Sequence, residues 1–302
     1  MIVTGAGSRD RLDDYHAARP APGAPPRPGM VWVPGGTFLK GCDHFYPEER
    51  PQASCDVAGF WMDTTPVTNA GFRAFVKATG HVTTAEQPIF EGGRALPPHG
   101  MVFVSPKEPV PLEDPTRWWR IVDGATWQAP RGPASSRPDR WLFHPVVQVS
   151  LADAQAYARW AGADLPSEAE WEFAARAGLD GAVFAWGDVD DPAAANRWRG
   201  TFPRQSEKRG GRYTSPVDQH PPNRYGLRDM IGNVWEWTAS PAKEPGSCCS
   251  APTGGTAPRH VLKGGSHLCA PNYCFRYRPA ARMFHDVTAP TSHIGFRCVI
   301  RA

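Results

Sequence analysis

The chain has 302 residues, and its 33 Lys and Arg against 30 Asp and Glu give a formal net charge of +3. This small charge excludes the clustered basicity of a nucleic-acid binder or of a protein that binds anionic membranes, so we expect neither partner. Hydrophobic residues make up 41% of the chain, enough for a large core without disulfide staples, while 30 Gly and 33 Pro predict many loops.

The N-terminal residues 1–28 are predicted to form a flexible, proline-rich arm, because proline removes backbone donors and restricts the residue before it. The first residues lack a positively charged segment followed by an apolar one, so we expect no secretory signal and a cytoplasmic location. No stretch has the eighteen or so apolar residues that a membrane span needs. A single folded domain is predicted over residues 29–302.

The first predicted element of that domain is a short strand over 30–33, followed by a Pro-Gly-Gly turn. Apolar residues at helical spacing then predict three helices, over 68–80, 150–162 and 167–178. Ser167 and Glu170 form a capping box that marks the start of the third helix.

The rest of the domain is predicted to be low in regular structure. The segments 86–143 and 203–222 show no periodicity, and loops of this length often build a binding groove. Short apolar pieces at 146–149 and 261–262 are separated by Gly, Pro, Asn and Asp. With 12 Trp available, we expect buried aromatic side chains to hold the domain together.

Several common active-site motifs are missing from the sequence. None of the ten His belongs to a His-x-Asp, His-x-Glu or His-Glu-x-x-His motif, which makes histidine-based metal chemistry improbable. No G-x-G-x-x-G and no P-loop lysine motif is present. A serine nucleophile elbow near Ser266 fails because Leu268 stands where a glycine is required.

The cysteines carry the most informative pattern. Cys269 and Cys274 are separated by four residues, and converging thiolates at such a spacing are soft ligands that suit Cu(I). Arginines after Cys274 favour the thiolate form. From the spacing alone, a disulfide, half of a zinc site completed by Cys248 and Cys249, inert core cysteines, and a redox or copper site all stay open. No role is predicted for Cys42 and Cys55.

Blocks of sequence along the chain resemble the formylglycine-generating enzyme family, also called sulfatase-modifying factor. The matching blocks lie at 33–38, 46–49, 66–69, 165–172, 232–237, 263–266 and 295–298. A further stretch that begins at Ser266, Ser-x-x-Cys-x-x-x-Tyr-Cys-x-Arg-Tyr-Arg, singles out the formylglycine-generating branch. The resemblance implies an α+β domain of the complex C-type-lectin-like type with little regular secondary structure. We expect a monomer.

The resemblance also implies a reaction. A cysteine in a C-x-P-x-R segment of a sulfatase would be oxidised by O2, with copper, to Cα-formylglycine. Cys269 and Cys274 would hold the Cu(I), Ser266 and Tyr273 would hydrogen-bond the substrate or oxygen, and Trp237 would shape the pocket. Arg276 and His293 are expected to contact the substrate; many relatives carry Asn at the position of His293.

Calcium is the second cofactor that the resemblance implies. The backbone carbonyls of Ile231, Gly232 and Val234 and the carboxylate of Glu236 would form one structural site, since oxygen atoms are the ligands that Ca²⁺ prefers. From the residues alone, a buried Trp-rich turn with Glu236 bonded to backbone is an equal alternative. A further calcium site near Asn196 is not expected, because its acidic ligand would fall at Gly210. A lectin-like calcium module without catalysis is the competing functional interpretation.

Overall fold

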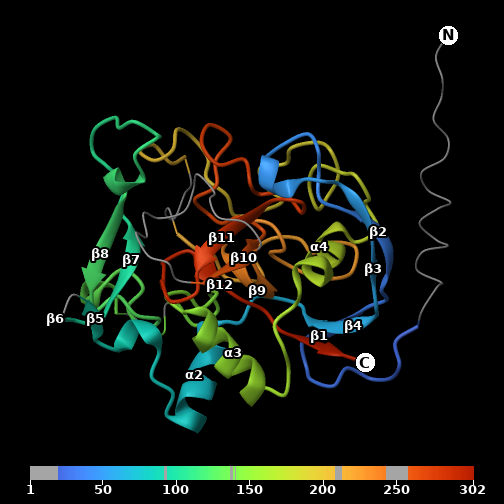
Figure 1. Ribbon diagram of the computed structural model, residues 1–302, viewed down its shortest axis with the longest axis horizontal. Coiled ribbons are helices and arrows are strands. Elements are labelled where there is room, and N and C mark those ends of the chain that lie inside the picture. The colour runs from blue at the N-terminus through green and yellow to red at the C-terminus, as the bar shows by residue number, and fades with distance from the viewer. Residues whose placement is uncertain (1–19, 92–93, 137–138, 140, 208–212, 243–257) are drawn as a thin grey trace.

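The computed structural model describes residues 20–91, 94–136, 139, 141–207, 213–242 and 258–302 (Figure 1). Most of the predicted arm, Gly210, Cys248 and Cys249 lie outside the described residues. At the described end of the arm, Arg27 forms an ion pair with Asp63 at 2.7 Å. Among the residues described, no helix has the length and apolar character to cross a membrane.

Two small sheets form the centre of the α+β fold. The four-stranded sheet has the order β11–β10–β9–β12 and joins β9 (Trp235–Pro241), β10 (Arg259–Lys263), β11 (Arg282–Asp286) and β12 (Ile294–Gly295). Only the β12–β9 pairing is parallel. The antiparallel three-stranded sheet has the order β1–β4–β13 and joins β1 (Met30–Val33), β4 (Phe60–Asp63) and β13 (Val299–Arg301).

Three two-stranded hairpins flank these sheets: β2 (Gly36–Lys40) with β3 (Ala53–Val57), β5 (Ile89–Glu91) with β6 (Arg94–Leu96), and β7 (His99–Phe103) with β8 (Trp119–Asp123). Figure 1 shows β7 and β8 on one side of the central sheet and β2 and β3 on the other. The prediction of an irregular segment over 86–143 was therefore wrong in part. Its strands pair with each other, and they alternate too briefly to stand out by periodicity.

The three predicted helices are confirmed as α2 (Asn69–Thr79), α3 (Leu151–Trp160) and α4 (Glu168–Arg176). Each begins at a hydroxyl side chain that accepts from a backbone N–H inside the helix, as N-caps do. The third helix ends at Arg176, two residues before the predicted glycine, because Ala177 itself adopts the left-handed conformation with φ of 45°. Short 3₁₀ helices occur at η1 (Pro47–Glu49), η2 (Thr84–Glu86), η3 (Pro115–Arg117) and η4 (Pro133–Ser135).

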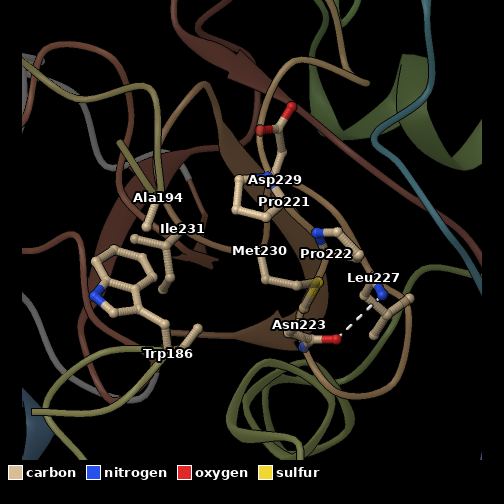
Figure 2. Close-up of a pocket in the computed structure, with 10 residues that line it drawn as sticks. Trp186, Ala194, Pro221, Pro222, Asn223, Leu227, Asp229, Met230 and Ile231 are labelled. Carbon is tan, nitrogen blue, oxygen red and sulfur yellow. Dashed lines mark hydrogen bonds between the residues drawn. The ribbon is translucent and has the colours of Figure 1, made fainter. Parts of the chain in front are cut away.

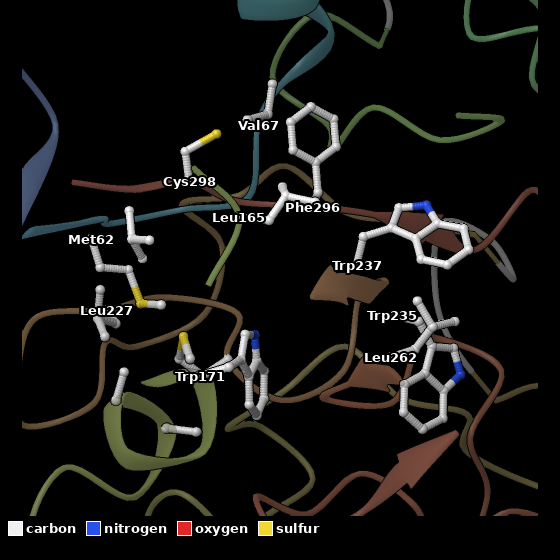
Figure 3. Packing of buried hydrophobic residues seen from close by; sticks show 14 of the residues in the cluster. Met62, Val67, Leu165, Trp171, Leu227, Trp235, Trp237, Leu262, Phe296 and Cys298 are labelled. Atoms are coloured by element: carbon white, nitrogen blue, oxygen red, sulfur yellow. The ribbon is translucent and has the colours of Figure 1, made fainter. Parts of the chain in front are cut away.

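Aromatic side chains fill the core, as the composition predicts. Trp171, Trp235 and Trp237 are buried near the central sheet, where they pack with residues such as Leu262 and Phe296 (Figure 3). A second, smaller cluster contains Phe103, Trp118, Trp198, Phe202, Leu268 and Ala270. The second cluster includes the start of the predicted C-x4-C segment, so aromatic packing supports the loop that carries the two cysteines.

Candidate functional site

The candidate site begins at the turn after β10. Gly264 and Gly265 adopt positive φ angles of 94° and 70°, a conformation that glycine tolerates and other residues rarely adopt. A Cβ atom on Gly265 would lie 2.8 Å from the carbonyl oxygen of Arg276. The Gly-Gly pair therefore lets the segment before Ser266 lie directly against the chain that follows Cys274.

The C-x4-C loop brings its two sulfur atoms to one point. The Sγ atoms of Cys269 and Cys274 are 3.4 Å apart, and both side chains are buried. The Ser266 N–H points at the Cys269 sulfur at 3.4 Å, and the Cys274 N–H donates to the Ala270 carbonyl at 2.9 Å. The separation exceeds the roughly 2.05 Å of a disulfide bond, and neither cysteine is in a disulfide.

The donor set of this loop fits copper better than zinc. Two sulfurs suit Cu(I), which accepts few ligands, whereas a structural zinc site needs four. Across the described ranges, no group of three or more His, Cys, Asp and Glu side chains could hold a metal ion. The alternative of a zinc site completed by Cys248 and Cys249 falls outside the described residues.

A cavity of about 30 Å³ lies beside the sulfur pair. Ser266, Tyr273 and His293 line it together with both cysteines, so the structure brings these five predicted residues together. A cavity of this size can hold a water-sized molecule. The Ser266 hydroxyl also accepts from the Leu268 N–H at 3.2 Å, which helps to fix the turn before Cys269.

Aromatic rings hold Tyr273 at the cavity wall. The Tyr273 ring stacks on Phe202 with centroids 4.6 Å apart and meets the edge of Trp118 at 5.3 Å. Asn272, in the same loop, bonds both the N–H and the carbonyl of Phe202 through its side-chain amide. Trp118 and Phe202 also line the cavity, so the long segment 86–143 contributes to the site, together with the residue just before the segment 203–222.

Nearly the whole chain matches a known protein family. The sulfatase-modifying factor enzyme 1-like domain family matches residues 16–302. The chain belongs to this family. It is 49% identical to the formylglycine-generating enzyme of Mycobacterium tuberculosis over 291 residues, which cover 89% of this chain and 97% of that protein. It is 44% identical to the formylglycine-generating enzyme of Streptomyces coelicolor, with 93% of each chain covered.

A solved structure shares the fold. PvdO from Pseudomonas aeruginosa superposes with a TM-score of 0.59 and 26% identity, and the match covers 90% of this chain and 94% of PvdO. The family resemblance of the sequence motifs and the α+β fold with little regular structure are thus confirmed. What this member of the family can do depends on the residues around its sulfur pair.

Two aromatic residues of β9 differ in their relation to the site. Trp235 lines the cavity, whereas Trp237, the residue expected to shape it, is not among the residues that do. The Trp237 indole instead donates to the Val149 carbonyl at 3.1 Å and is fully buried. A strand advances about 7 Å over two residues. The tryptophan that contacts the cavity is therefore Trp235, at the end of β9 nearer the cysteines, and not Trp237.

Arg276 is placed differently from its expected role in substrate binding. Its side chain is only 1% exposed and pairs with Glu48, with the Arg276 Nε 3.0 Å from a Glu48 oxygen. Its Nη1 lies 4.0 Å from the Cys274 sulfur. The guanidinium therefore contacts one of the two sulfur-bearing residues rather than an open surface.

His293 lies in the wall of the cavity beside the two cysteines. Its ring lies 4.7 Å from the ring of Trp119, and its Nδ1 is 3.1 Å from the Thr291 hydroxyl. Burial, with smaller contributions from His267 and His285, lowers the pKa of His293 well below its usual range. The imidazole is thus neutral at physiological pH and offers the cavity wall a polar but uncharged group.

Acidification should destabilise the protein through these buried histidines. Burial also lowers the pKa of His285, so both rings bind protons more weakly in the folded than in the unfolded chain. Their stabilising effect is complete above the ordinary pKa near 6.5 and is lost below it, at up to about 1.4 kcal/mol per pH unit for each histidine. Urea unfolding at pH 7.5 and 5.5 measures this loss in an Asp229→Asn background, because Asp229, with its pKa raised to about 7, gains a proton in the folded chain over the same range and would offset it. His285→Gln should reduce it, and an unchanged loss in that variant would contradict the assignment.

Glu236, the one predicted calcium ligand with a charged side chain, belongs to a buried polar cluster. The Glu236 carboxylate accepts from Nε and Nη2 of Arg297 and from the Trp171 indole, each at 2.8 Å. Close by, the Asp229 Oδ2 accepts from the Asn233 amide at 2.8 Å, while its Oδ1 is buried and has no hydrogen-bond partner among the described residues. A buried carboxylate oxygen without a partner is what a bound cation would satisfy, so Asp229 fits calcium, whereas both Glu236 oxygens already bond Arg297.

Asp229 is the residue of this cluster that the sequence analysis did not identify. Burial, opposed in part by its bond to Asn233, raises its pKa to about 7. Asp229, Trp186 and Ile231 line the same cavity of about 50 Å³, and in Figure 2 the carboxylate points away from these two apolar side chains. The available signal was an acidic residue three positions before Gly232, at the start of the same turn.

Proposed function

We propose that the chain oxidises the cysteine of a C-x-P-x-R segment in a sulfatase to Cα-formylglycine, with O2 as co-substrate and Cu(I) as cofactor. The observation that carries this proposal is the pair of buried sulfurs, 3.4 Å apart, beside a small cavity. The enzyme class agrees with the formylglycine-generating enzymes to which the chain is 44–49% identical.

In this proposal Cys269 and Cys274 hold the copper ion. Bound copper would supply the electron transfers between the substrate sulfur and O2 that protein side chains cannot perform. The protein contributes soft ligands, a Ser266 N–H directed at the Cys269 sulfur, and a buried wall that limits access of water. Tyr273 and His293 offer the cavity a hydroxyl and a neutral imidazole with which to orient the substrate.

The electron balance of the proposed reaction determines which reagents an assay needs. Oxidising the cysteine Cβ to an aldehyde removes two electrons, and hydrolysis replaces sulfur by oxygen and releases sulfide. Reduction of O2 to water takes four electrons, so a reductant must supply the other two. A C-x-P-x-R peptide incubated with the protein, Cu(I), O2 and a thiol reductant should therefore gain an aldehyde that mass spectrometry and hydrazide labelling detect. Absence of aldehyde, with no tight Cu(I) binding, would favour a binding module without catalysis.

We also propose a structural calcium ion held by the Asp229 and Glu236 carboxylates and by the backbone carbonyls of the turn at Ile231, Gly232 and Val234. The buried Asp229 oxygen without a partner supports this site. Calcium should raise the melting temperature relative to protein in a chelator, and magnesium should not replace it, because Mg²⁺ demands a tighter octahedral shell. Asp229→Asn should remove most of the calcium-dependent rise. An equal rise in that variant would exclude Asp229 as a ligand.

A cytoplasmic location and a monomeric state remain proposals that follow from the sequence alone. Size-exclusion chromatography with light scattering tests the second of them.

A further inference from the structure

We propose that residues 45–49, here called the clamp, position the Cys274 sulfur for copper, with Tyr46 and Glu48 as the positioning residues. The inference rests on the proposed function and assigns a role to a segment far from the cysteines in sequence. The clamp comprises Phe45, Tyr46 and the 3₁₀ helix η1 (Pro47–Glu49). It lies between β2 and β3.

The clamp contacts the backbone immediately after Cys274. The Tyr46 hydroxyl accepts from the Phe275 N–H at 3.0 Å. The next side chain, Arg276, pairs with Glu48 and places its guanidinium carbon 3.7 Å from the centre of the Tyr46 ring. One face of the guanidinium therefore packs on an aromatic ring, and its N–H groups donate to a carboxylate. Its Nη1 lies 4.0 Å from the Cys274 sulfur.

A second arginine fastens the same segment. The Arg278 guanidinium pairs with the Glu49 carboxylate, and its carbon lies 3.8 Å from the centre of the Phe45 ring. The Arg278 Nε also donates to the Phe275 carbonyl at 2.8 Å. Both polar groups of the Phe275 backbone are thus held, one by Tyr46 and the other by an arginine that Glu49 fixes.

The clamp is itself anchored to the body of the fold. The Cys42 N–H donates to the Glu49 carbonyl at 3.2 Å. One residue earlier, the Gly41 N–H donates to the buried carboxylate of Glu172 on α4 at 2.8 Å. The β2–β3 hairpin is thereby tied to a core helix, and the clamp gives Cys274 a fixed reference outside its own loop.

The C-x4-C loop needs contacts from outside the loop to fix its Cys274 end. Cys269 is held on its own side by Ser266, and its carbonyl accepts from the Trp198 N–H at 2.9 Å. Beyond it, Pro271 and Asn272 are exposed, so the loop reaches the surface before it returns to Cys274. If the return segment could move, the two sulfurs would separate, and binding a metal would have to restore their positions at a cost in free energy.

Two conservative substitutions test the clamp. Tyr46→Phe removes the hydroxyl that accepts from Phe275 but keeps the ring under Arg276, and Glu48→Gln keeps the shape but removes the charge. Each should weaken Cu(I) binding about 10- to 100-fold, the usual effect of losing a group that orients a metal ligand. The measurement is anaerobic competition with a chromophoric Cu(I) chelator. Asp190→Asn is a control for the loss of an ion-pair charge, because Asp190 pairs with the nearly buried Arg197, although its carboxylate is 43% exposed against 12% for Glu48.

A readout without copper separates positioning from general stability. In the reduced metal-free protein, alkylation of Cys274, followed by peptide mass spectrometry, should be faster in Tyr46→Phe and Glu48→Gln than in the wild type or in Asp190→Asn. A lower melting temperature with unchanged Cu(I) affinity and unchanged Cys274 alkylation would overturn the proposal and leave the clamp a merely structural contact.

The clamp and the proposed oxidase can fail separately. If the wild type binds Cu(I) tightly but makes no aldehyde, the proposed function is wrong. The Cu(I) affinities of the variants then still show whether the clamp positions the Cys274 sulfur. If the wild type does not bind Cu(I), the oxidase fails, and the alkylation rates alone then support or reject positioning by Tyr46 and Glu48.

Discussion

Cys269→Ser and Cys274→Ser should each lower the rate of aldehyde formation by at least about a thousandfold, which corresponds to roughly 4 kcal/mol in the activation barrier. Each substitution replaces one of two sulfurs 3.4 Å apart with a hard oxygen that binds Cu(I) poorly. The rates should be measured with saturating copper on a C-x-P-x-R peptide.

Cys55→Ser is the control for these variants. Cys55 is partly exposed on β3, belongs to no disulfide and is not among the residues that line the cavity, so its loss should leave the rate near that of the wild type. The cysteine variants should also fail to retain Cu(I) against a chelator while they unfold at the temperature of the wild type. Full turnover in either variant would rule out the sulfur pair as the cofactor site.

Local signals in the sequence predicted the helices well. A hydroxyl residue before an apolar-periodic stretch, as at Ser150 and Ser167, satisfies backbone donors within three residues, so the signal and the structure lie in the same short segment. The same holds in part for the two cysteines, whose spacing predicted that their sulfurs could converge. The choice of copper over a disulfide, however, needed the resemblance to a family.

Contacts between distant segments could not be predicted in this way. Arg276 and Glu48 are 228 positions apart, and nothing in either segment alone shows that the arginine is buried against that carboxylate. The prediction therefore assigned the guanidinium to a substrate. Similarly, Trp235 and Trp237 are equivalent aromatic residues in the sequence, and only the end of β9 nearer the cysteines distinguishes them.

Buried polar groups explain the remaining difference. Asp229 is an ordinary acidic residue in a turn by sequence, and its importance comes from burial that leaves one oxygen without a partner. Burial is a property of the whole fold, so a single sequence does not reveal it. The pairing of Glu236 with Arg297 also depends on the whole fold, because 61 positions separate the two residues in the sequence.

Glu236→Gln should destabilise the folded protein by about 3–5 kcal/mol, because it leaves the Arg297 guanidinium as an uncompensated buried charge. Neither side chain has any exposed surface, and the guanidinium forms two 2.8 Å bonds to the carboxylate. This loss is a large part of the 5–15 kcal/mol that typically separates folded from unfolded proteins. Urea unfolding in the presence of a calcium chelator measures it without any contribution from a bound cation.

The double variant Glu236→Gln with Arg297→Met distinguishes the lost ion pair from lost packing. Removing both charges should recover a large share of the stability, because an isolated buried charge costs more than a neutral side chain of similar length. Recovery will not be complete, since Arg297 also donates to the Arg228 carbonyl at 2.8 Å and Glu236 accepts from Trp171. If the double variant were less stable than Glu236→Gln by the full cost of a second independent substitution, the two residues would not be energetically coupled. The link that this pair makes between β9 and the segment before β13 would then depend on packing alone.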